Sequence, residues 1–179
     1  EFNERYCEEV DVLMWGETDS LIPKQTFEVL DSLHENNVHS GVHKYTAFFG
    51  TCKMWDESWK PVEHTDFTNK PFKEDWGDEQ IPWWDLRHNM TLKEMNDIND
   101  KTEELIVNTV SPTKFNGCGL VISSAVIRAG VNIPRSVFFV HEDTAFQNIF
   151  ERLMGDQAWQ FAIRNILLVH NRRHPDKRM

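Results

Sequence analysis

Residues 45–57 have the sequence Tyr45-Thr46-Ala47-Phe48-Phe49-Gly50-Thr51-Cys52-Lys53-Met54-Trp55-Asp56-Glu57. The first part is rich in aromatic residues with polar ones interleaved, which predicts a strand over 42–52. The strand leads into a tryptophan beside two carboxylates. Trp55 offers a π face that attracts a cationic ring, and a neighbouring carboxylate can accept two N–H donors at once. This combination suits recognition of a positively charged methylated purine. A strand that ends in one half-buried tryptophan is the structural alternative.

Length and charge limit the possible functions. The chain has 179 residues, which predicts a single domain over 1–179, large enough for a core without disulfides. Lys and Arg total 19 and Asp and Glu 29, so the net charge is −10, and the charged residues within 1–19 are mostly acidic. A net-acidic protein is not a general nucleic-acid binder, so we expect any RNA contact to be local and DNA not to be a partner. Because the chain does not begin with Met, we interpret it as a domain excised from a longer protein.

Cysteine and apolar content point to an intracellular setting. Three cysteines without a C-x-x-C pair predict neither a disulfide framework nor a zinc site. No apolar run approaches the ~20 residues of a membrane span. We therefore expect a cytoplasmic protein with no membrane partner, no metal and no cofactor.

Periodicity and turn residues predict the order of the elements. Strands are expected over 10–15, 42–52, 119–126, 136–141 and 161–169, and helices over 24–36, 91–110 and 143–154. Residues 59–84 contain four of the seven tryptophans and several acids, which is typical of a long exposed loop. The basic tail 171–179 is expected to be flexible. Short neighbouring strands with helices between them predict an α+β fold, in which an antiparallel sheet is covered on one face by about three helices.

Two blocks of the chain resemble the translation initiation factor 4E family. Tyr45-Thr46-x-Phe48, followed by Met54-Trp55-Asp56-Glu57, is similar to the family's Y-S-L-F…M-W-E-D run. Cys118-Gly119-Leu120-Val121 is similar to its C-G-A-V-V strand. The resemblance implies a curved antiparallel sheet, backed by helices on its convex side, with a ligand site on its concave side. It also implies non-catalytic recognition of the 7-methylguanosine cap of messenger RNA in translation, with capped RNA or 7-methyl-GTP as ligand.

The resemblance assigns roles to particular residues. Trp55 stacks on the methylated base, and Asp56 or Glu57 accepts the N–H groups of its edge. The family's second stacking tryptophan has no counterpart in 16–23, so the facing ring is expected from the long loop. Cations near the second block, followed by those of the tail, are expected to contact the phosphates. The candidate cap-binding residues are Trp55, Asp56, Glu57, Trp59, Trp76, Trp83, Arg128 and Arg135, with Arg172 and Arg173 as further phosphate candidates.

A protein-binding role is a second hypothesis. In the 4E family, scaffold or repressor peptides dock on the convex helical face, and here that face is expected around Phe27, Leu30 and Leu33. These three residues recur at three-residue steps in the first predicted long helix. The missing loop tryptophan and the sparse cations favour a 4E-like module that has lost cap binding and interacts with proteins instead.

An enzyme is the third hypothesis. Residues 116–121, with the Ala129-Gly130-Val131 and Ile133-Pro134-Arg135 segments, resemble the NlpC-type cysteine hydrolases, whose nucleophile opens a helix. Cys118 is then the candidate nucleophile, because a helix N-terminus lowers the pKa of a thiol. The family's cysteine falls on Gly117, however, and its H-x-G-I strand is missing. Cys118 as a small buried core residue is the structural alternative.

Overall fold

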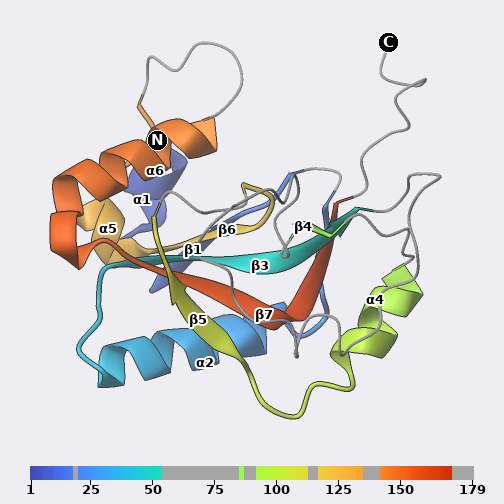
Figure 1. Cartoon of the computed structure of the whole chain (residues 1–179). Coiled ribbons are helices and arrows are strands. Elements are labelled where there is room, and N and C mark those ends of the chain that lie inside the picture. Colours follow the sequence, from blue (N-terminus) through green and yellow to red (C-terminus); the bar gives the residue numbers. More distant parts are fainter. Residues whose placement is uncertain (18–19, 54–84, 87–91, 113–116, 135–141, 171–179) are drawn as a thin grey trace, which may run out of the picture.

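The structure is a computed structural model that describes residues 1–17, 20–53, 85–86, 92–112, 117–134 and 142–170 (Figure 1). Its helices and strands make an α+β fold, as predicted. Among the described helices, none is both long and apolar enough to cross a membrane. In chain order the elements are α1 (Phe2–Tyr6), β1 (Val12–Trp15), β2 (Ser20–Leu21), α2 (Thr26–His39), β3 (Tyr45–Lys53), β4 (Asp85–Leu86), α4 (Leu92–Asn99), β5 (Val107–Val110), β6 (Leu120–Ser123), α5 (Ser124–Arg128), α6 (Glu142–Met154), the 3-10 turn Gly155–Gln157 and β7 (Trp159–His170).

The sheet is mixed, so the prediction of an antiparallel sheet is wrong. Its strands follow the order β1-β6-β3-β7-β2, with β4 beside β3 and β5 beside β7. The central pair β3 and β7 is parallel, and β4 also runs parallel to β3. The other pairs are antiparallel. Because β3 and β7 lie far apart in the chain, no local turn sets their relative direction.

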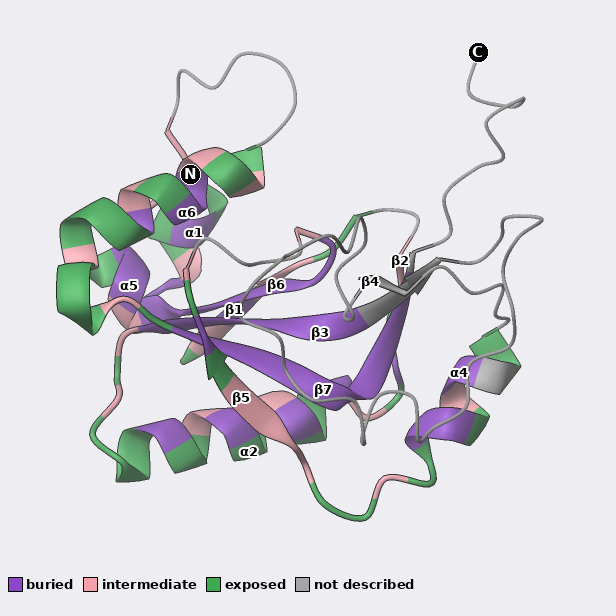
Figure 2. Cartoon of the chain, in the orientation of Figure 1, coloured by how far each residue is buried: buried purple, intermediate pink, exposed green. Residues whose placement is uncertain are grey.

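Helices cover both faces of the sheet, where one covered face was predicted. Successive residues of β6 point to opposite faces. Val121 packs in one buried cluster with Leu33 of α2. Leu120 and Ile122 pack in the other with Phe146 of α6. Figure 1 shows α2 on one side of the sheet and α1, α5 and α6 on the other, and Figure 2 shows the buried sheet between them.

Two predicted elements differ from the structure. The predicted helix 91–110 ends at Asn99, and Val107–Val110 instead forms strand β5 along β7. This segment is rich in β-branched residues, which favour a strand where a neighbouring strand is available. The predicted strand 119–126 ends at Ser123, and α5 begins at Ser124. The predicted strand 136–141, the loop 59–84 and the tail 171–179 lie outside the described residues.

Strand β7 contains an irregularity that shapes one end of the sheet. Phe49 of β3 pairs with Ile163, but the next residue of β3, Gly50, pairs with Leu167. Residues 164–166 therefore have no partner on β3. Asn165 within this bulge accepts a hydrogen bond from the backbone N–H of Ile106 at 2.8 Å. The bulge thus connects β7 to the segment that leads into β5.

Candidate functional site

Most of the predicted cap site lies outside the described residues. This holds for Trp55, Asp56, Glu57, Trp59, Trp76, Trp83 and Arg135, and for Arg172 and Arg173. The structure does describe the strand that leads to the site. β3 ends at Lys53, two residues before Trp55, and lies between β6 and β7. The chain therefore enters the Trp55 segment from a central strand of the sheet.

Arg128 is the predicted phosphate ligand that the structure describes. It is the last residue of α5, and its Nη1 donates a hydrogen bond to the backbone carbonyl of Cys7. Cys7 is the C-terminal cap of α1. Carbonyls at a helix C-terminus lack partners within the helix, and an arginine there is favourable for both hydrogen bonding and charge. In the described structure this guanidinium joins α1 to α5.

Arg164 does not belong to an exposed basic stretch. From sequence it is the first cation of the C-terminal region that also contains Arg172 and Arg173. In the structure it lies within β7, and its side chain is buried. Burial lowers the pKa of its guanidinium, because the charged form loses hydration.

Cys118 has the surroundings of a core residue. It is 2% exposed and packs with α2 and the sheet, which confirms the prediction of a buried core position. Its Sγ lies 2.9 Å from Oγ of Ser20. The residue precedes strand β6, and helix α5 begins only at Ser124. The helix N-terminus that would activate a thiol is therefore not located at Cys118.

An open groove of about 700 Å³ lies between α1, β1 and α2. We call it the α1–α2 groove. The strand β1 and the segment before it form its floor, and the two helices form its walls. Its lining residues are Phe2, Tyr6, Val10, Asp11, Val12, Leu13, Met14, Phe27, Leu30, Asp31, His34 and Glu35.

The groove exposes an unusual amount of apolar side chain. Phe27 is 81% exposed, Phe2 63% and Val10 42%. The helix geometry explains the position of Phe27. Val29 and Leu33 are four residues apart and face the core, whereas Phe27 lies off this stripe. Of the predicted docking residues, Phe27 and Leu30 line the groove, but Leu33 is buried in the core and cannot contact a partner.

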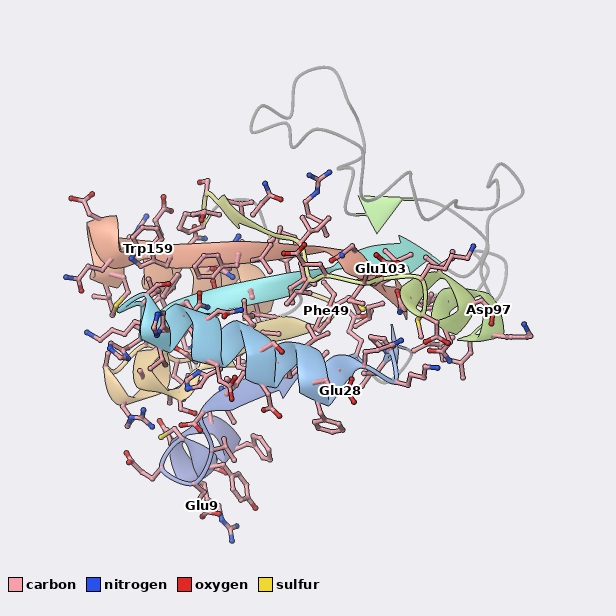
Figure 3. All side chains as sticks on the ribbon, turned by 90° about the horizontal axis from the view of Figure 1, so that it is seen from below. Glu9, Glu28, Phe49, Asp97, Glu103 and Trp159 are labelled. Carbon is pink, nitrogen blue, oxygen red and sulfur yellow. The ribbon has the colours of Figure 1, made fainter. Side chains whose placement is uncertain are left out.

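The rim of the groove is acidic. Asp11, Asp31 and Glu35 line it, and the lining residues include no lysine or arginine. Figure 3 shows two further acidic residues, Glu9 beyond α1 and Glu28 on α2. A surface that combines exposed aromatic rings with carboxylates favours a ligand that is both apolar and basic.

A buried tyrosine contacts His34, one of the residues that line the groove. The hydroxyl of Tyr45 lies 3.1 Å from Nδ1 of His34. Burial raises the pKa of Tyr45, so its hydroxyl stays protonated and forms a hydrogen bond with the imidazole. Nε2 of the same imidazole lies 3.9 Å from Oδ1 of Asp11. The core thereby orients His34 toward the groove and toward the carboxylate of Asp11.

Sequence reasoning missed the half of the groove that comes from the N-terminal segment. Phe2 and Tyr6 of α1 and Asp11 before β1 were not predicted to act with α2. One feature of the sequence could have indicated it: Phe2 and Tyr6 lie within residues 1–19, whose charged residues are mostly acidic. The pairing of α1 with α2 across β1 is a tertiary feature, and no periodicity within either helix indicates it.

Comparisons of the chain with protein-family models, with curated proteins and with solved structures found no match. Within the described ranges, no group of three or more His, Cys, Asp or Glu side chains is arranged to hold a metal ion. The α1–α2 groove is thus the described feature with the strongest indication of binding.

Proposed function

We propose that this chain is a protein-interaction domain, and that its α1–α2 groove binds a basic, apolar peptide segment of a partner. The observation that supports this most strongly is the exposure of Phe27 and Phe2 on opposite walls of a groove with an acidic rim. Exposed apolar patches rimmed by polar groups mark interaction sites on monomeric proteins.

Burial of the Phe27 ring by a bound peptide is expected to contribute much of the binding free energy. Burying a side chain of this size contributes about 1.5–3 kcal/mol through the hydrophobic effect. The carboxylates of Asp11, Asp31 and Glu35 attract lysine or arginine residues of the peptide and raise the rate of encounter. Because these charges lie at the rim, they select the partner more than they tighten the complex.

The test is a selection from a library of 12-residue peptides that contain apolar residues with flanking Lys or Arg, followed by calorimetry on the selected peptides. Phe27→Ala is expected to weaken binding by about 2 kcal/mol or more, as for aromatic hot spots. Leu153→Ala is the matched control, because Leu153 is a 62% exposed residue of α6 that does not line the groove. If the library yields no binder, or if both variants bind like the parent, the groove is not the site.

Recognition of the 7-methylguanosine cap is a second proposal. It is supported by the sequence around Trp55, Asp56 and Glu57, which follows directly from the central strand β3. A methylated guanine carries a positive charge that strengthens stacking on an indole by about 0.5–2 kcal/mol. The two proposals concern different parts of the chain and can be tested separately.

Trp55→Ala is expected to abolish retention on a 7-methyl-GTP resin, because the stacking surface is lost. Unmethylated GTP is expected to bind far more weakly to the parent protein, since removal of the methyl group removes the positive charge. Trp159→Ala is the matched control, because Trp159 is a partly exposed tryptophan at the start of β7. Equal affinity for GTP and 7-methyl-GTP, or full retention of Trp55→Ala, contradicts this assignment.

A further inference from the structure

Strand β1 is an edge strand of the sheet, and the α1–α2 groove runs along it. In the strand order, β1 is the terminal strand and pairs with β6 within the described part of the sheet (Figure 1). Backbone N–H and C=O groups on the outer side of an edge strand are available for pairing with another chain.

The register shows which backbone groups point outward. The N–H of Ser124 donates to the carbonyl of Asp11 at 2.9 Å, so these two residues form a hydrogen-bonded pair. Antiparallel pairing alternates, and Val12 and Met14 are opposite Ser123 and Val121 in the same register. Their backbone groups therefore point away from β6. No backbone hydrogen bond joins either of them to another described residue on that outer side.

The groove is open over this edge and not over a face of the sheet. Five consecutive residues, Val10 to Met14, line it. Successive side chains of a strand point to opposite faces, so a groove over one face would contact every second residue only. Of these five, Val12, Leu13 and Met14 belong to β1; Val12 and Met14 pack against the cluster on the α2 face and Leu13 belongs to the cluster on the other face. The lining therefore includes residues of both faces, as expected for a groove along the strand edge with α1 on one face and α2 on the other.

We propose that the partner segment binds in an extended conformation and adds a strand to the β1 edge. This inference rests on the proposed peptide-binding function. Alternate side chains of the added strand would then face α2, at Phe27 and Leu30, and α1, at Phe2 and Tyr6. The occupant is therefore a peptide with apolar residues at alternate positions and with Lys or Arg near Asp11 and the other rim acids. Main-chain pairing supplies affinity in this mode, and the side chains supply specificity.

Two peptide libraries separate an extended ligand from a helical one. In the first, apolar residues occupy alternate positions, and in the second they occupy positions i, i+3, i+4 and i+7, with Lys and Arg elsewhere in both. Binders are expected from the first library. If binders come from the second library alone, the groove binds peptides as the proposed function states, but the extended mode is wrong. If neither library yields a binder, the proposed function itself fails.

Residue-resolved amide exchange measures the pairing directly. With a peptide of the first library bound, exchange of the Val12 and Met14 amides is expected to slow by about tenfold or more, since they gain partners. The amides of Leu13 and Trp15 already face β6 and are expected to change less. Binding that leaves Val12 and Met14 unchanged overturns the proposal.

A backbone variant gives an independent measurement. Val12→Pro removes an outward N–H at the first position of an edge strand, where proline is tolerated. We expect it to lower affinity by about tenfold, the effect of one lost hydrogen bond. Val12→Ala, which keeps the N–H and shortens the side chain, is the matched control and is expected to bind more tightly than Val12→Pro. Equal affinities of the two variants contradict strand addition.

Discussion

Replacing Phe146 with alanine is expected to lower the free energy of unfolding by about 3–5 kcal/mol, the cost of removing a buried phenyl ring. Phe146 is fully buried on the inner face of α6. Its ring contacts Trp15 of β1 edge to face, at 5.6 Å between centroids, and stacks with Phe150 at 6.2 Å. Removal leaves a cavity between α6 and the second face of the sheet. Urea denaturation followed by circular dichroism measures the effect.

This result tests the second helical layer directly. Leu153→Ala on the same helix is the control, because Leu153 is exposed and such substitutions usually change stability by less than about 0.5 kcal/mol. If Phe146→Ala is as stable as Leu153→Ala, α6 does not pack on the sheet through Phe146, and the covering of both faces is wrong.

Replacing Asn99 with alanine is expected to lower the free energy of unfolding by more than is usual for a polar side chain. The side chain of Asn99, at the end of α4, donates through Nδ2 to the carbonyl of Leu167 at 3.0 Å and accepts through Oδ1 from its N–H at 2.8 Å. Both residues are buried. Each buried group left without a partner costs about 1–3 kcal/mol, so the total loss should exceed about 2 kcal/mol.

Asn99→Asp and Asp97→Ala complete this experiment. Asn99→Asp keeps the acceptor for the N–H of Leu167 but loses the donor to its carbonyl, so it should also destabilise the fold. Asp97 is exposed on the same helix and pairs with Lys93, an i,i+4 contact worth about 0.3–0.5 kcal/mol. In thermal unfolding, the midpoint temperature of Asp97→Ala is expected to be the closest of the three variants to that of the parent. A parent-like Asn99→Ala would show that this contact does not hold α4 to β7.

Part of the α1–α2 groove could be predicted from the sequence. The helix at Phe27 and Leu30 and the strand before Trp15 were both predicted, and both line or border the groove. Leu33 was predicted to belong to the same exposed face as Phe27 and Leu30, because it follows at the same three-residue step. A helix turns every 3.6 residues, so a three-residue step drifts around its surface. Leu33 therefore reaches the core, together with Val29, while Phe27 stays exposed.

Local sequence alone determined the elements with strong patterns: the strand from Tyr45, the helix that contains Phe146 and the final strand that contains Ile163, together with the α+β class. Only the tertiary structure decided that β3 and β7 run parallel, that Val107 starts a strand and that helices cover both faces of the sheet. The physical reason is that periodicity reports which side of an element is apolar, but not which distant element covers it. The α1–α2 groove depends on such a distant pairing, because β1 becomes an edge only once the order of all strands is set.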